Sequence, residues 1–285
     1  RRWGRIRPEV KVAMLQGNLS FDEPESALVW KYQEGYVQMA DRLPESVDLL
    51  VLPESPSPRM FEYDADYREM LERLARRYPL GLVFNNIYHA EASPAPRYFN
   101  SAYFLGSDGK ELGRYDKIRL VPFGEYIPWR SVFFFAETIS RDVSDFYPGR
   151  DYLVVKLGDH PVNAIICFEA LFPQLVRRFV RGGSQLIINL TNDGWYGASA
   201  APYQHLAMSC WRAVENRRYL LRATNSGISA IVDPTGRVQA STGLLRRDSC
   251  LGRFAFISTL SIYARYGNVF AILCAIITCL ALLPV

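Results

Sequence analysis

The sequence has few of the residues that hold metal ions or disulfide frameworks. Its 285 residues include three histidines and five cysteines, and no two cysteines have the C-x-x-C spacing typical of structural zinc sites. An odd number of cysteines in a chain of this length also does not favour a disulfide framework. We therefore expect no metal site, and we expect three cysteines to be packing residues: Cys210, Cys274 and Cys279.

The sequence also lacks a stripe of one charge, an internal repeat and a low-complexity segment. Its net charge is +4, and the basic pairs are dispersed along the chain, at 1–2, 76–77, 177–178, 217–218 and 246–247. Because nucleic-acid binding needs clustered basic residues, a nucleic acid is not an expected partner. A mildly basic face near anionic lipid is compatible with this charge.

What the chain does have is an alternation of strand and helix patterns, with 49% hydrophobic residues that are enough to bury a large single core. Strands are expected at residues 10–15, 48–52, 80–87, 98–105, 152–156, 162–166, 185–190, 228–232 and 238–240. Helices are expected at 28–43, 67–78, 170–181 and 201–216, and hairpin turns at 107–110 and 233–236. The pattern predicts an α/β protein with two β-sheets and helices outside them.

Cys167 ends an apolar strand and precedes an apparent helix. The free backbone N–H groups of a helix start favour a thiolate and can hold an oxyanion, so this is a position for a nucleophile. The alternative is a small buried hydrophobe. His89, His160 and His205 lie outside the segments rich in other candidate groups, so a base other than histidine is expected.

Two further segments offer partners for this thiol. Glu54 follows the apolar strand 49–52, and Lys117 lies in the segment 115–126. A carboxylate at a strand end becomes a general base when burial raises its pKa, and a lysine stabilises a thiolate and an oxyanion. The sequence therefore predicts a Glu-Lys-Cys triad.

The surrounding motifs occur in a specific order. They are Gln16-Gly17-Asn18, Pro53-Glu54-Ser55, Asp116-Lys117, the run from Leu120 to Tyr126, Ile166-Cys167-Phe168-Glu169, the run from Asn192 to Gly197, Gln204-His205, the run from Arg212 to Asn216, and the run from Arg222 to Ser229. From about Val10 to the C-terminus the chain resembles the nitrilase (carbon-nitrogen hydrolase) superfamily. Within it, the similarity is greatest to the bacterial apolipoprotein N-acyltransferases.

This resemblance implies an α-β-β-α sandwich and specific roles. Glu54 would be the general base, Lys117 the stabiliser of oxyanion and thiolate, and Cys167 the nucleophile that carries a thioester. Glu125 and Glu169 match two supporting acidic positions. Their alternatives are a solvated loop charge for Glu125 and a first-turn helix carboxylate for Glu169.

The chain departs from the family pattern at two places. Phe168 stands where many members have tyrosine directly after the catalytic cysteine, so any role of that hydroxyl is absent. The loop after Gln16-Gly17-Asn18 lacks an early tryptophan, and the first one downstream is Trp30.

Aromatic residues suggest where a substrate would bind. Trp195 and Tyr196 follow an apolar strand and are expected to wall the pocket, although a plain strand-to-helix connection would also explain them. Phe133 and Phe134, in the aromatic segment 129–136, are expected to enter a bilayer or guide an acyl chain. Burial under the sandwich is the alternative for that segment.

The C-terminal run 269–285 has 17 residues and no charge. As a helix it would span about 25 Å, against about 30 Å for a hydrocarbon core, and Tyr263, Arg265 and Tyr266 precede it as interfacial anchors would. We expect a transmembrane helix; a buried core helix is the alternative. The start of the chain has no signal peptide and no initiator Met, as expected of a part of a longer protein. The resemblance implies that a membrane domain precedes residues 1–9, and we expect 10–260 to be catalytic and 261–285 to be interfacial and transmembrane.

The resemblance implies a membrane-bound acyltransferase of lipoprotein maturation. The implied donor is a phospholipid, the acceptor is the N-terminal amine of an S-diacylglyceryl-cysteine apolipoprotein, and no cofactor is implied. The implied location is the bacterial inner membrane, multi-pass in the full protein, with the catalytic domain facing the periplasm. The alternatives are an amidase that gives its acyl group to water, and a non-catalytic binding module. Retention of Glu54, Lys117 and Cys167 together argues against the module.

Overall fold

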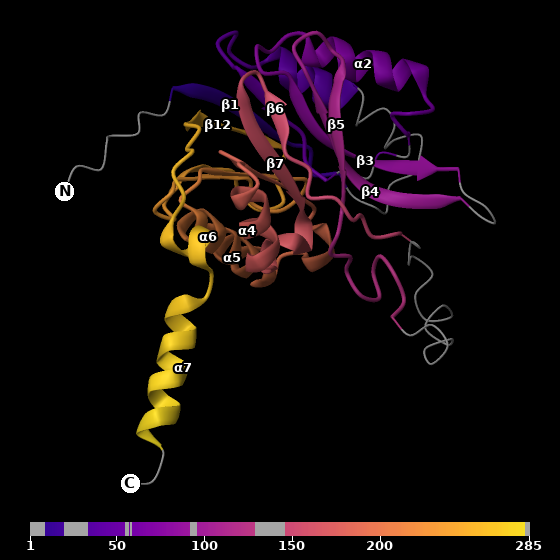
Figure 1. The fold of residues 1–285 in the computed structure, drawn as a ribbon. Coiled ribbons are helices and arrows are strands. Elements are labelled where there is room, and N and C mark those ends of the chain that lie inside the picture. Colours follow the sequence, from indigo (N-terminus) through magenta and orange to yellow (C-terminus); the bar gives the residue numbers. More distant parts are fainter. Residues whose placement is uncertain are drawn as a thin grey trace.

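The computed structural model describes residues 9–19, 34–54, 57, 59–91, 96–128 and 146–282. Two six-stranded sheets stack face to face, with helices on both outer sides (Figure 1). The predicted α/β class and the α-β-β-α layering are confirmed.

The first sheet has the strand order β12-β1-β2-β3-β4-β5. Its strands are β1 Val10–Gln16, β2 Leu49–Val51, β3 Leu82–Ala90, β4 Arg97–Leu105, β5 Glu111–Asp116 and β12 Asp248–Phe254. β1, β2 and β3 are parallel, and the outer strands pair antiparallel. The hairpin predicted at 107–110 joins β4 to β5.

The second sheet has the order β11-β10-β9-β8-β7-β6. Its strands are β6 Val155–Leu157, β7 His160–Ile166, β8 Ile187–Thr191, β9 Leu220–Thr224, β10 Ala230–Val232 and β11 Val238–Ser241. β7, β8 and β9 are parallel, so their carboxyl ends meet at one edge of the sheet. Parallel sheets commonly place functional loops at that edge.

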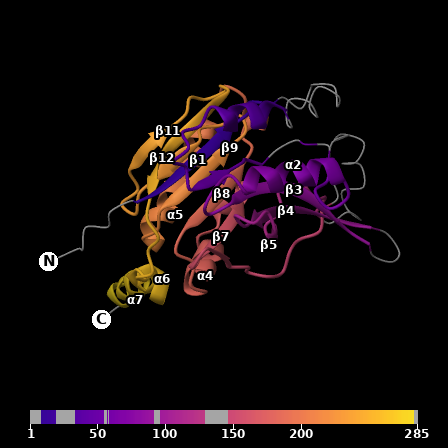
Figure 2. The same cartoon turned by 90° about the horizontal axis from the view of Figure 1, so that it is seen from above.

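Helices cover the outer face of each sheet. α2 Ala65–Ala75 packs against β3, and α5 Ala201–Asn216 packs against β9 and α4 Pro173–Arg181 (Figure 2). Two short 3₁₀ helices, η1 Cys167–Leu171 and η2 Gly194–Tyr196, follow β7 and β8. Residues 34–41 are also helical, and α6 Ile262–Tyr266 leads to α7 Val269–Ala281.

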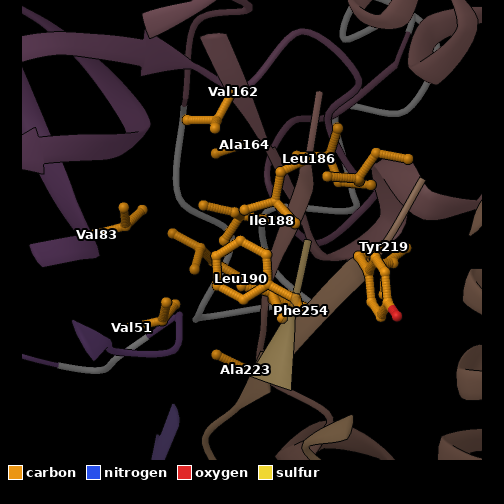
Figure 3. Close-up of a cluster of buried hydrophobic side chains, with 14 of the residues drawn as sticks. Val51, Val83, Val162, Ala164, Leu186, Ile188, Leu190, Tyr219, Ala223 and Phe254 are labelled. Carbon is orange, nitrogen blue, oxygen red and sulfur yellow. The ribbon is translucent and has the colours of Figure 1, made fainter. Parts of the chain in front are cut away.

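The strand alternation of β1 explains why both of its faces are buried. Val12 and Met14 join the core between the sheets, whereas Ala13 and Leu15 pack in the layer that contains α2. In Figure 3, side chains of the first sheet lie across the inter-sheet core from those of the second. Successive side chains of a strand point to opposite faces, so a strand between two layers is apolar throughout.

Three strands were not predicted individually. β5 was implied only by its hairpin turn, and β12, at the edge of the first sheet beside β1, has neither an apolar run nor a regular alternation. β9 is interrupted by Arg222, whose burial is made possible by hydrogen bonds that no local pattern reveals. The helix predicted at 170–181 begins at Pro173, because η1 takes up the preceding residues.

The apolar C-terminal run forms α7, which has 13 residues and exposed side chains and extends away from the sandwich (Figure 1). At 1.5 Å per residue it is about 20 Å long, shorter than a hydrocarbon core of about 30 Å. Among the residues that the structure describes, no helix has the length and apolarity needed to cross a membrane. The predicted transmembrane helix is therefore not confirmed. Phe133 and Phe134 lie outside the described residues.

Candidate active site

The predicted triad comes together where three strands end. Glu54 follows β2, Lys117 follows β5 directly, and Cys167 follows β7 directly. The Nζ atom of Lys117 lies 3.8 Å from Oε1 of Glu54 and 2.8 Å from Oε1 of Glu125. Glu54 and Lys117 both act electrostatically on the thiol of Cys167, and the Glu54 side chain and the backbone N–H of Asn192 are its polar neighbours. A thiol, a carboxylate and an ammonium therefore share one site.

Asn100 holds the two carboxylates of this site in place and was not predicted. Its Nδ2 donates to Oε1 of Glu54 and to Oε1 of Glu125, both at 2.8 Å, and Nδ2 of Asn85 donates to its Oδ1 at 2.6 Å. The backbone N–H of Val121 donates to Oε2 of Glu125 at 2.8 Å. Glu125 is thus a bound carboxylate and not a solvated loop charge.

Glu169 connects the loop that carries the lysine to the loop that carries the cysteine. Its side chain is fully buried. Its oxygens accept hydrogen bonds from Tyr115 Oη at 2.7 Å and from the backbone N–H groups of Ile118 at 2.8 Å, Arg119 at 3.0 Å and Ile166 at 2.8 Å. Because charge-assisted bonds to backbone N–H groups are strong, this carboxylate fixes the spacing between the two loops.

The backbone of Cys167 is in the left-handed region, with φ of 47°. Residues other than glycine rarely adopt this conformation, and it occurs where surrounding contacts enforce it. The left-handed turn therefore lies at the junction of β7 and η1, at the residue that carries the thiol.

Burial decides the protonation of the thiol. Burial, followed by the nearby charge of Glu54, raises the pKa of Cys167 to about 12, although Lys117 opposes this. The prediction that the strand-to-helix junction favours a thiolate was therefore wrong, because η1 is short and the site excludes water. The resting thiol keeps its proton until a base removes it.

The other two groups have the protonation that such a reaction needs. Burial raises the pKa of Glu54, against the opposing charge of Lys117, so the carboxyl binds a proton more readily than a solvated one. Burial alone would lower the pKa of Lys117, but the carboxylates of Glu54 and Glu125 outweigh it and raise that pKa. The site thus combines a base of increased proton affinity with a permanent ammonium.

The remaining candidates border the site to different extents. Phe168 makes an edge contact with Phe172 at 5.1 Å between ring centroids. Burial, followed by the charge of Cys167, raises the pKa of Tyr196, which indicates that its ring lies near the thiol. Trp195 is 67% exposed in the same turn.

His205 also lies beside Cys167. The sequence had shown no other candidate catalytic residues in the segment around this histidine. Its Nε2 is 3.2 Å from the backbone carbonyl oxygen of Cys167 and its Nδ1 is 2.9 Å from Oδ1 of Asp193. The hydrogen bond of His205 is to the backbone carbonyl of Cys167 and not to its thiol, so the two side chains do not form a Cys-His pair.

In the described part of the chain, no cluster of three or more His, Cys, Asp or Glu residues could hold a metal ion.

Curated relatives match most of this chain. An apolipoprotein N-acyltransferase from Geobacter metallireducens is 38% identical over 272 residues, covering 93% of this chain and 51% of the relative. An apolipoprotein N-acyltransferase from Bradyrhizobium diazoefficiens is 34% identical over 290 residues, covering 96% of this chain and 52% of the relative. The chain therefore spans about half the length of these relatives.

Solved structures share the fold at low identity. Nit3 from Saccharomyces cerevisiae, a member of branch 10 of the nitrilase superfamily, has a TM-score of 0.65 at 19% identity and covers 88% of this chain and 91% of its own. An amidase from Nesterenkonia sp. has a TM-score of 0.64 at 18% identity, covering 95% and 99%. The family model described as carbon-nitrogen hydrolase matches residues 11–251. The two stacked sheets and this match over most of the chain show that it belongs to the carbon-nitrogen hydrolase family.

Proposed function

We propose that this chain is the catalytic part of an acyltransferase that moves an acyl chain from a phospholipid, through a thioester on Cys167, to the N-terminal amine of an S-diacylglyceryl-cysteine apolipoprotein. The observation that carries the chemistry is the placement of Cys167 among the same buried groups as Glu54 and Lys117, with the Lys117 ammonium 3.8 Å from the Glu54 carboxylate. The names of the relatives support the substrates. Residues 10–260 form the catalytic domain in this proposal.

In the first half-reaction the Cys167 sulfur attacks the ester carbonyl while Glu54 takes the thiol proton. A tetrahedral oxyanion forms, and the Lys117 ammonium stabilises it. The ester C–O bond then breaks, and Glu54 returns the proton to the leaving alkoxide. Lysophospholipid departs and a thioester remains.

In the second half-reaction the acceptor amine attacks the thioester carbonyl. Glu54 takes a proton from the amine, and the C–S bond breaks as the amide forms. The same proton returns to the Cys167 sulfur, which restores the resting site. Trp195 and Tyr196 wall the entrance to the thiol, and Phe168 with Phe172 forms an apolar patch next to it.

Glu54→Gln is expected to lower the rate of acyl-enzyme formation by about 100-fold to 10,000-fold, the usual size of a general-base contribution. Because the pKa of Glu54 is raised above its ordinary 4.5, the parent rate should increase as pH rises through that elevated pKa, and then level off. The variant should lose this limb and respond only as pH approaches the pKa of the thiol, which is lower than in the parent because the charge of Glu54 no longer raises it.

The measurement is the rate of acyl-enzyme formation as a function of pH. Glu111→Gln is the matched control, because burial also raises the pKa of Glu111, at the other end of β5 from Lys117. A Glu54 variant with the parent profile would assign the base to another group.

The destination of the acyl group separates a transferase from an amidase. The protein is incubated with phospholipid and its intact mass is followed for a hydroxylamine-sensitive acyl adduct. A diacylated lipopeptide is then added. Transfer of the adduct to the peptide amine supports the proposal. An adduct that is lost to water as free fatty acid, with the peptide unchanged, would favour the amidase.

The proposal includes a membrane location. α7 is apolar and exposed, and Tyr266, just before it, is 63% exposed. We place α7 in lipid, in a bacterial inner-membrane protein that is multi-pass and has its catalytic domain facing the periplasm. Phe133 and Phe134 are assigned to the lipid or acyl-chain path.

The placement of α7 in lipid is tested by flotation of the protein with anionic vesicles. Replacing Ile276 and Ile277 with lysine is expected to abolish vesicle binding. Flotation that is unchanged in this variant would contradict the placement of α7 in lipid.

A further inference from the structure

A buried charged cluster lies directly behind the nucleophile, and the proposed reaction does not use it. It consists of Asp193 after β8, His205 on α5 and Arg222 on β9, here called the His205 cluster. Arg222 is fully buried, Asp193 is 1% exposed and His205 is 7% exposed. Burying charge is costly unless each group is paired, so such a cluster calls for a role.

The cluster is held by direct contacts. Nη2 of Arg222 donates to Oδ2 of Asp193 at 2.7 Å and lies 3.2 Å from Nδ1 of His205. Nη1 of Arg222 donates to Oδ1 of Asn189 at 2.7 Å and to Oγ of Ser209 at 3.1 Å. These bonds tie together β8, β9 and α5. The imidazole is therefore held from one side by a carboxylate that is itself fixed by a guanidinium.

The free edge of this imidazole meets the nucleophile's backbone. Nε2 of His205 is 3.2 Å from the carbonyl oxygen of Cys167, which can only accept, so Nε2 carries the proton in this contact. Cys167 has φ of 47°, a conformation that other contacts must hold. Asn192, whose backbone N–H is a polar neighbour of the thiol, precedes Asp193 in the chain. The cluster thus contacts both segments that set the position of the thiol.

We infer that His205 is a positioning residue: it donates from Nε2 to the Cys167 carbonyl and holds the left-handed turn that aims the thiol at Glu54. Asp193 and Arg222 orient the ring. This inference rests on the proposed function in one respect, that Cys167 is the nucleophile. Burial, followed by the charge of Arg222, lowers the pKa of His205, and Asp193 opposes this. In a neutral ring with its proton on Nε2, Nδ1 accepts from Nη2 of Arg222, whereas in a charged ring Nδ1 donates to Asp193; Nε2 donates to the Cys167 carbonyl in both.

The test compares His205→Leu, which fills the space without a donor, with His205→Gln, whose side-chain amide supplies one. The rate constant for alkylation of Cys167 by iodoacetamide is measured by peptide-resolved mass spectrometry, beside the rate of acyl-adduct formation from phospholipid. His205→Leu should lower both rate constants roughly 10-fold to 100-fold, because the buried carbonyl loses the Nε2–H donor of His205. His205→Gln should recover most of this loss, and the KM for phospholipid should not change.

A purely structural histidine would give a different result. It would reduce the melting temperature and the fraction of protein that reacts, and leave the rate constant of the folded fraction unchanged in both variants. His160→Leu is the matched control, because the ring of His160 stacks on Phe256 and hydrogen-bonds to Gln185, and neither residue belongs to the site. Parent-like rate constants in His205→Leu, or a glutamine variant as slow as the leucine variant, would overturn the inference.

The two measurements also separate this inference from the proposed function. If the parent forms no acyl adduct but His205→Leu still slows alkylation of Cys167, the positioning role stands and the phospholipid donor is wrong. If the parent forms the adduct and both variants react at the parent rate, the donor stands and the positioning role is wrong.

Discussion

Cys167→Ala is expected to abolish acyl transfer, with a fall of about 10,000-fold or more, because the thioester has no other sulfur at the site on which to form. The thiol is the group on which the charges of Glu54 and Lys117 act within the site. The mass of the alanine variant should remain that of the free protein after incubation with phospholipid. Folding should be nearly unaffected, since alanine replaces a small buried side chain.

Cys250→Ala is the control for this change. Cys250 is buried on β12, and its pKa is raised to about 12, first by burial and then by Asp248. It therefore matches Cys167 in burial and protonation and lacks the carboxylate and ammonium partners. Full activity is expected in this variant. If the acyl adduct still formed in Cys167→Ala and was absent from Cys250→Ala, Cys167 would not be the nucleophile.

Lys117→Met is expected to lower the rate of acyl-enzyme formation by about 100-fold to 1,000-fold, the usual cost of removing one oxyanion donor. It should also destabilise the fold by about 3–5 kcal/mol, because it leaves the Glu54 and Glu125 carboxylates buried without their cation. Lys117 is 1% exposed, so water does not replace the lost charge.

The stability loss should depend on pH in a definite direction. Without the ammonium, which lowers the pKa of Glu54 in the parent, that pKa rises further above the ordinary 4.5 in the folded state. A carboxyl group whose pKa is higher in the folded than in the unfolded state lowers the free energy of unfolding as pH rises through the folded pKa. The loss of stability of Lys117→Met relative to the parent should therefore be largest at neutral pH and shrink as pH falls toward 4.5.

Urea unfolding at several pH values measures this, together with the rate of adduct formation. Lys110→Met is the control: its side chain is 82% exposed beside Asp108, and an exposed pair contributes little. A pH-independent deficit in Lys117→Met would mean that the loss comes from packing and not from the unpaired carboxylates.

Much of the fold follows from local patterns. β7 and β8 were recognised because strands buried on both faces are apolar throughout, and the 201–216 helix was predicted with the bounds that the structure shows. β9 was missed because Arg222 interrupts its apolar run, and only contacts with Asn189 and Asp193 make the arginine compatible with burial.

The site divides in the same way. The sequence by itself identified the residues proposed as base, ammonium and nucleophile: Glu54 and Cys167 follow apolar strands, and Lys117 belongs to the same ordered set of motifs. The roles of Glu125, Glu169, Asn100 and His205 depended on the tertiary structure, since their partners are far away in the chain, as in the bond between Asn100 and Glu54.

Protonation, too, was decided by the tertiary structure. The sequence indicated a thiolate at a helix start, and burial instead keeps Cys167 protonated while two carboxylates keep Lys117 charged. The physical reason is that the free energy of a charge depends on how completely water is excluded and on which charges lie within a few ångströms, and neither quantity is encoded in any short stretch of residues.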